Sequence, residues 1–74
     1  MFKVYGTSSC AWCDRAKELL QSKAKPVEYV SVEVDEDAQQ MFREKRLRTV
    51  PQVFHNGEHI GGYEALADYL LEIS

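Results

Sequence analysis

Two cysteines separated by two residues, Cys10 and Cys13, limit the fold more than any other feature of this sequence. A short apolar and aromatic run at 2–5 precedes them and is predicted to form a strand. The residues at 16–20 that follow them are mostly strong helix formers. The pair is therefore predicted to lie where a strand leads through a loop into a helix, with Cys10 at the helix start and Cys13 one turn inside.

This position affects the two thiols differently. The first N–H groups of a helix have no partner within it, and the helix dipole favours negative charge there. We expect the Cys10 sulfur to accept a hydrogen bond from the Cys13 N–H and to gain most from that bond as a thiolate. Thiols at helix starts in C-x-x-C sequences have pKa values lowered to about 3.5–7.5. Cys13 should be more buried. We therefore predict that Cys10 attacks a disulfide and that Cys13 resolves the resulting mixed disulfide.

Length and composition indicate an ordinary globular chain. Its 74 residues predict one domain over 1–74, and 45% of them are apolar. The net charge of −3 argues against a nucleic-acid binder, which would need a basic face. No apolar run approaches about 18 residues, and Met1 leads directly into the first predicted strand. We expect a soluble, cytoplasmic monomer with no membrane partner.

The cysteine count favours chemistry over a structural role. Two cysteines make at most one disulfide, and the bond would close a loop of only four residues. Such a loop constrains the unfolded chain very little. Redox or metal chemistry therefore explains the pair better than a structural disulfide does.

The first half of the chain predicts two more elements after the first strand. A helix is expected over 11–24, because the residue before Pro26 avoids the helical region. A strand is expected over 27–34, β-branched and largely buried, with Val34 on its inner face. A second helix should open with acids at 35–37, and its best core candidates are Met41 and Phe42.

The second half predicts a hairpin and a last helix. Short runs at 51–55 and 58–60 flank Asn56-Gly57, which is the strongest short-range hairpin signal. The last helix should run from Tyr63 to about Ile73, and its apolar side chains recur at helical spacing; they are Leu66, Tyr69, Leu70 and Ile73. The order β-α-β-α-β-β-α predicts an α/β fold with a parallel first pair of strands, an antiparallel hairpin and a four-stranded mixed sheet flanked by three helices.

Three stretches narrow the class of protein. A C-x-x-C at a helix start inside a βαβ unit is typical of thioredoxin-like redox proteins. The segment 10–17, CAWCDRAK, resembles the glutaredoxin active site, which usually reads C-P-Y-C before a similar R-A-K. The segment 49–54, TVPQVF, resembles the T-V-P-Q-[IV]-F of that family, and 59–64, HIGGYE, is similar to its H-I-G-G-x-[DST]. The resemblance spans nearly the whole chain and implies a dithiol glutaredoxin with a thioredoxin-like fold.

The resemblance implies a binding site for glutathione. In glutaredoxins the segment that here reads Thr49-Val50-Pro51 carries a cis-proline, and the backbone before that proline pairs with the cysteinyl part of glutathione. Val50 would take that role here and align the glutathione sulfur with Cys10. Trp12 stands where the family commonly has tyrosine, and its ring would cover the bound substrate.

The glycine pair before the last helix implies the other end of that site. N–H groups that follow Gly62, those of Tyr63 and Glu64, would bind the γ-glutamyl carboxylate, because helix starts bind anions. The Glu64 carboxylate would then face the ammonium group of the same residue of glutathione. Glu64 is longer than the aspartate, serine or threonine that is usual at this position.

Two departures from the family pattern leave the reductant open. Thr7 stands where glutaredoxins often have a lysine or arginine near the glycyl carboxylate, and its lack of charge weakens the case for glutathione unless Arg46 or Arg48 supplies the contact. The alternative is a glutaredoxin-like redoxin reduced by thioredoxin reductase. Ala11 stands where proline is usual, and some family members without that proline bind an iron–sulfur cluster.

The resemblance also implies partners. We expect glutathione as reductant, no bound cofactor, and transfer of electrons to protein disulfides or glutathionylated thiols. The opening segment 1–6 and the pair Cys13-Asp14 look like bacteriophage glutaredoxins that donate electrons to ribonucleotide reductase, which is therefore the first candidate partner.

A zinc module is the alternative from another class. Cys10, Cys13, His55 and His59 are ligand types that zinc accepts. The 41 residues between Cys13 and His55 far exceed zinc-finger spacing, and the two histidines flank a predicted turn. We therefore predict no metal ligands and expect the histidines to face solvent or to cap neighbouring groups.

Overall fold

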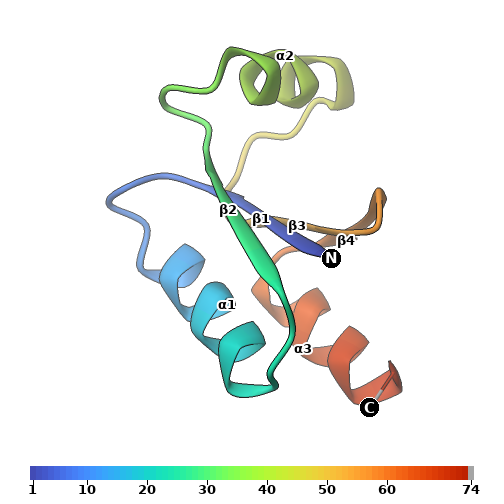
Figure 1. Ribbon diagram of the computed structural model, residues 1–74. Coiled ribbons are helices and arrows are strands. Elements are labelled where there is room, and N and C mark those ends of the chain that lie inside the picture. Colours follow the sequence, from blue (N-terminus) through green and yellow to red (C-terminus); the bar gives the residue numbers. More distant parts are fainter. Residues whose placement is uncertain (74) are drawn as a thin grey trace.

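A mixed sheet lies between helices on its two faces. The computed structural model describes residues 1–73. Within that range the elements are β1 (Phe2–Gly6), α1 (Ala11–Ser22), β2 (Val27–Ser31), α2 (Glu36–Lys45), β3 (Gln52–His55), β4 (Glu58–Gly61) and α3 (Tyr63–Ile73). Figure 1 shows α1 and α3 on one side of the sheet and α2 on the other. The predicted order of elements is confirmed.

The pairing of the strands follows from their connections. The sheet order is β2-β1-β3-β4. β1 and β2 are joined through a helix and run parallel, whereas β3 lies antiparallel to both β1 and β4. Asn56 and Gly57 turn the hairpin with φ angles of 51° and 87°, the positive values that such two-residue turns require. The predicted hairpin and the four-stranded mixed sheet within residues 1–73 are confirmed.

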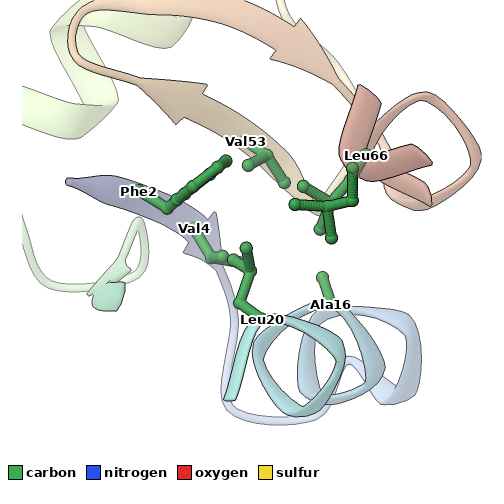
Figure 2. Close-up of a cluster of buried hydrophobic side chains, with 7 residues drawn as sticks. Phe2, Val4, Ala16, Leu20, Val53 and Leu66 are labelled. Carbon is green, nitrogen blue, oxygen red and sulfur yellow. The ribbon is translucent and has the colours of Figure 1, made fainter. Parts of the chain in front are cut away.

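The main core lies between the sheet and the pair α1 and α3. Side chains alternate along a strand, so Phe2 and Val4 point to the same face. Figure 2 shows these two converging with Val53 of β3, Leu20 of α1 and Leu66 of α3. All of them are at most 2% exposed. This face therefore holds β1, β3, α1 and α3 together around one cluster.

The helix on the opposite face, α2, buries fewer of its residues than α1 or α3 does. Tyr5 contacts Phe54 edge-on and Phe42 of α2 at ring-centroid distances of 5.4 and 6.1 Å. In α2 the buried residue is Ala38, while Met41 and Phe42 are only half-buried. Met41 and Phe42 are therefore less buried than the predicted core positions should be, because α2 lies over the face opposite the main cluster.

The first helix is shorter than expected. It ends at Ser22 rather than at about 24, because Ala24 adopts a left-handed conformation with φ of 57°. The Lys25 N–H then donates to the Leu20 carbonyl and the Ala24 N–H to the Gln21 carbonyl, both at 3.0 Å. These bonds satisfy the last carbonyls of the helix and end it before Pro26 is reached.

The second strand is also shorter than expected. β1 ends at Gly6, which pairs with Ser31, so β2 has no neighbouring strand beyond that point. The chain turns instead, and the Asp35 N–H donates to the Ser31 carbonyl at 3.0 Å. Val34, expected on the buried face, is 80% exposed. The Asp35 carboxylate caps α2 by accepting from the Ala38 N–H at 2.9 Å.

The last helix has the predicted bounds, Tyr63–Ile73. Leu66 and Leu70 are buried, and Tyr69 packs partly against the cluster. Ile73, predicted on the same stripe, is 44% exposed, because it lies one turn beyond Leu70, the last member of the cluster in this helix. No helix within the described 1–73 is long and apolar enough to cross a membrane.

Candidate active site

The two cysteines form a disulfide at the start of α1. Cys10 is the N-cap residue, with extended backbone, and its Sγ accepts a hydrogen bond from the Cys13 N–H at 3.0 Å. Cys13 is fully buried, whereas Cys10 is half-buried. The predicted capping bond and the deeper burial of Cys13 are both confirmed. The accessible sulfur is thus the one placed where a helix start stabilises a thiolate.

Gly6 brings β1 against the dithiol. A Cβ atom built on Gly6 would lie 2.6 Å from the Cys13 Sγ and 2.5 Å from the Tyr29 Oη. Real Cβ atoms essentially never lie so close to another atom, so a side chain at this position would force Cys13 or Tyr29 to shift, and glycine avoids that. Sequence analysis missed this role, because a glycine at a strand end is also typical of an ordinary turn.

A pocket of about 480 Å³ lies beside the dithiol. Trp12, between the cysteines, forms one wall. Further walls come from the loop before β3 and from the start of α3. The lining residues are Trp12, Thr49, Val50, Pro51, Gly62, Tyr63, Glu64 and Ala65. The pocket wall thus holds the seven residues that the sequence predicted as glutathione-binding, and it adds Ala65. Among the described residues 1–73, it does not hold the predicted carboxylate contacts, Arg46 and Arg48. The Val50-Pro51 peptide is cis.

The start of α3 opens into this pocket. The first helical hydrogen bond runs from the Leu66 N–H to the Gly62 carbonyl at 2.9 Å. The N–H groups of Tyr63 and Glu64 precede that bond, where a helix has no partners of its own for them. The Glu64 side chain is exposed. This arrangement can bind a carboxylate through backbone N–H groups and a cation through Glu64.

Comparison with known proteins agrees with this geometry. Residues 2–60 match the family model described as Glutaredoxin. The glutaredoxin of Enterobacteria phage T4 is 36% identical over 85 residues, covering 93% of this chain and 98% of that one. The chain belongs to the glutaredoxin family. Glutaredoxins are thiol–disulfide oxidoreductases, and the Cys10–Cys13 disulfide is the redox-active group expected of a member.

Two solved structures share the fold. A buckwheat glutaredoxin–glutathione complex gives a TM-score of 0.80 at 24% identity, covering 96% of this chain and 68% of that one. NrdH-redoxin from Escherichia coli, described as a glutaredoxin-like protein with a thioredoxin-like activity profile, gives 0.82 at 18% identity, covering 99% and 93%. These likenesses establish the thioredoxin-like fold of this family member.

Trp12 is held as an exposed plate at the pocket. Its side chain is 52% exposed. The ring lies 5.3 Å from that of Tyr63, and the Arg15 guanidinium carbon lies 4.6 Å from the ring centroid. These contacts hold the indole in the pocket wall without burying it, so part of its surface is open to a ligand.

A buried amide stabilises the loop that carries Pro51. Gln52 is 8% exposed, and its Nε2 donates to the Thr49 carbonyl at 3.1 Å and to the Thr49 Oγ1 at 3.2 Å. Its Oε1 contacts the His59 Nε2 at 2.7 Å. Gln52 thus connects the pocket wall to β4. The burial of this polar side chain was the one feature of the segment that the sequence pattern did not predict.

The charged contacts proposed from sequence lie outside the pocket wall. Arg46 ends α2 in a left-handed conformation with φ of 57°, and Arg48 lies in the following loop; both are exposed. Within residues 1–73, neither is among those that line the pocket. Thr7 is half-buried, and its carbonyl accepts from the Tyr29 hydroxyl at 2.8 Å.

The two histidines are engaged away from the cysteines. The His55 ring stacks on Phe2 at 4.0 Å, and its Nδ1 contacts the Tyr69 Oη at 2.7 Å. His59 stacks on Phe54. Across the described part of the chain, no three histidine, cysteine or acidic side chains converge as metal ligands. The geometry therefore gives no support to a zinc module built from Cys10, Cys13 and these histidines.

Proposed function

We propose that this glutaredoxin is a glutathione-dependent dithiol oxidoreductase that reduces protein disulfides or glutathionylated thiols. The observation that carries the proposal is the pocket beside Cys10–Cys13, with Trp12, Val50-Pro51 and the start of α3 in its walls. Its backbone groups and Glu64 suit a ligand that carries a thiol, a carboxylate and an ammonium group. Glutathione has all three.

The exchange follows from the different positions of the two sulfurs. The Cys10 thiolate attacks one sulfur of a substrate disulfide, a new S–S bond forms, and the other sulfur leaves as a thiolate that takes up a proton. Cys13 then attacks the Cys10 Sγ, the mixed disulfide breaks, and the substrate leaves as a thiol. Two glutathione molecules reduce the Cys10–Cys13 disulfide and become glutathione disulfide, so the electrons balance.

A redoxin reduced by thioredoxin reductase is the second candidate. Thr7 brings no charge, and Arg46 and Arg48 lie outside the pocket wall, so none of these three positions supplies a cation for the glycyl carboxylate of glutathione. A protein reductase would not need one. The chemistry of the cysteines would stay the same in this case, and only the electron donor would differ.

Steady-state NADPH oxidation separates the two donors. One assay holds glutathione, glutathione reductase and a small mixed disulfide, and the other replaces the glutathione system with thioredoxin reductase. We expect turnover through glutathione. Turnover only with thioredoxin reductase would overturn glutathione dependence but keep the dithiol role. Absence of turnover in both assays would overturn the oxidoreductase proposal itself.

A charge reversal tests the pocket directly. Glu64→Lys should raise the KM for glutathione by about 5-fold or more, since it removes an exposed acid that would face the ligand's ammonium group. Glu72→Lys is the matched control, because Glu72 is also an exposed acid on α3 but lies in its last turn. Equal effects of the two variants would contradict the site.

We also propose ribonucleotide reductase as the first partner to test, and a monomer acting in the cytoplasm, where thiols are kept reduced. Cys13→Ser should trap a mixed disulfide between Cys10 and the partner, because the resolving thiol is gone. Cys10→Ser should trap none. Trapping through Cys13 alone would reverse the assigned roles.

A further inference from the structure

The hydroxyl of Tyr29, on the strand next to β1, lies close to the buried sulfur of the dithiol. We propose that the Tyr29 hydroxyl is a positioning group that holds Cys13 in its neutral thiol form in the reduced protein. The inference rests on the proposed roles of Cys10 as attacking thiol and Cys13 as resolving thiol. It adds a residue outside the C-x-x-C segment and outside the pocket wall.

The absence of a side chain at Gly6 is what lets these groups approach. The Tyr29 Oη and the Cys13 Sγ lie 2.5 and 2.6 Å from one point, the position that a Gly6 Cβ would occupy. The two atoms are therefore at most 5.1 Å apart, the sum of these distances. β1 and β2 pair in parallel, with Gly6 opposite Ser31, which places Tyr29 two residues earlier on the same face.

The hydroxyl proton of Tyr29 is already used. It is donated to the Thr7 carbonyl at 2.8 Å, within the loop that leads to Cys10. A tyrosine hydroxyl has one proton and two lone pairs, so toward Cys13 it can act only as an acceptor. Once reduction has broken the S–S bond that now fixes the Cys13 Sγ, the Cys13 thiol turns its S–H toward that oxygen. A Cys13 thiolate would instead face the negative end of the hydroxyl dipole.

The charged side chains near Tyr29 include two carboxylates and one ammonium group, which have opposite effects on a nearby negative charge. Asp14 of α1 and Glu33 of the loop after β2 lie near enough to raise the pKa of Tyr29, after the larger effect of its burial. Both carboxylates also oppose a thiolate on Cys13. Lys17 places its Nζ 5.6 Å from the centroid of the Tyr29 ring and opposes them. The hydroxyl therefore stays protonated near neutral pH and keeps its bond to Thr7.

The consequence is a division of charge between the two sulfurs. Cys10 holds a thiolate at the helix start, while Cys13 keeps its proton until the mixed disulfide has formed. In the resolving step Cys13 gives that proton to the departing substrate sulfur, bonds to the Cys10 Sγ, and the Cys10–substrate bond breaks. Retaining the proton until this point prevents Cys13 from competing with Cys10 for substrate.

The test removes only the hydroxyl. In a Cys10→Ser background, Cys13 is the single thiol, and its ionisation can be followed by thiolate ultraviolet absorbance against pH. Tyr29→Phe should lower the pH midpoint of thiolate formation by about half a pH unit or more, because an acceptor for the S–H is lost. Tyr69→Phe is the control: it also removes a tyrosine hydroxyl contact, that to His55 at 2.7 Å.

The outcomes are distinct. An unchanged or higher midpoint in Tyr29→Phe, or an equal fall in Tyr69→Phe, would overturn the proposal. Near-ultraviolet circular dichroism checks that the variants are folded, and Tyr29→Met provides a second variant without the hydroxyl. Because no glutathione is present, failure here is separable from failure of glutathione dependence.

A kinetic measurement adds an independent readout. In the otherwise unchanged protein, the pH profile of the resolving step should move to lower pH in Tyr29→Phe. The rate of the first attack by Cys10 should stay within about 2-fold, since the capping bond from the Cys13 N–H remains. A slower first attack with an unmoved profile would instead indicate a purely structural role.

Discussion

The two faces of the sheet differ in packing and in what they carry. The face covered by α1 and α3 contains a cluster of buried side chains, and the dithiol, Gly6 and Tyr29 lie at its edge. On the face covered by α2, Ala38 is the buried residue of the helix, and Phe42 is half-buried. Figure 1 shows how far α2 stands from the other two helices.

This difference shows why the chemistry lies on one face. Thiol exchange needs two sulfurs held at fixed positions, and a dense core supplies that rigidity because its side chains have few alternative arrangements. Cys13 packs at the end of that core with no exposed surface. α2 contributes none of the residues that line the pocket within the described chain.

The largest expected effect comes from the dense face. Leu20→Ala should lower the free energy of unfolding by about 2–5 kcal/mol, because Leu20 is fully buried and its removal leaves a cavity. Met41→Ala, on the other face, should cost about 1 kcal/mol, since Met41 is only half-buried. Chemical denaturation of both variants measures the difference. Equal losses would refute the contrast between the faces.

A smaller loss is expected where β1 meets the dithiol. Gly6→Ala should destabilise the fold by about 1–3 kcal/mol, because the added methyl group would overlap the Cys13 Sγ and the Tyr29 Oη. Gly62→Ala is the matched control for stability, since its Cβ would meet only the Pro51 carbonyl oxygen at an ordinary 3.7 Å. Thermal unfolding compares them. A tolerated Gly6→Ala would mean that the strand and helix can separate cheaply.

The start of α2 tests the looser face by itself. Asp35→Ala should cost about 0.5–2 kcal/mol, because the carboxylate no longer accepts from the Ala38 N–H. Asp35→Asn, which keeps an acceptor oxygen, should restore most of the stability. Turnover with a small disulfide at a permissive temperature should be unchanged in both. A loss of activity in folded Asp35→Ala would show that α2 matters to the site.

The smallest effect is a pH dependence on the dense face. Burial, with Asp14 and Glu33, raises the pKa of Tyr29 above its usual 10.0, so the fold favours the neutral hydroxyl. The stability that this group contributes is complete below pH 10.0 and is lost as pH rises through its folded pKa. Tyr29→Phe should therefore flatten the fall in unfolding free energy at alkaline pH. If the unfolding free energy falls equally with pH in the unchanged protein and in Tyr29→Phe, the raised pKa of Tyr29 is contradicted.

Local patterns in the sequence were enough for the order of elements and for the dithiol, whereas the pocket segments 49–51 and 62–64 were predicted from their resemblance to glutaredoxin motifs. C-x-x-C before a helix, Asn56-Gly57 between apolar runs and the stripe through Leu66 and Leu70 each depend on neighbouring residues. Spacing alone therefore reveals them. The Cys10 capping bond was predictable for the same reason, because both partners lie within one helical turn.

The predictions that failed concern strand length and side-chain burial, which depend on where one element packs against another. β2 stops at Ser31 because β1 ends opposite it, and Val34 is exposed in consequence. Met41 and Phe42 have core-like side chains, yet their burial depends on how close α2 lies to the sheet. Neither outcome is encoded in the pattern of a single segment.

By itself, then, the sequence determined the fold class and the position of the dithiol, since periodicity, turn residues and helix caps act over a few residues. The segments that gather around the dithiol were predicted from their resemblance to glutaredoxin motifs. Only the tertiary structure decided that the sheet has one dense face, and that Gly6 leaves room for Cys13 and Tyr29 to meet. Such contacts join residues 7 to 23 positions apart across different elements. Their distances follow from packing, which no local pattern records.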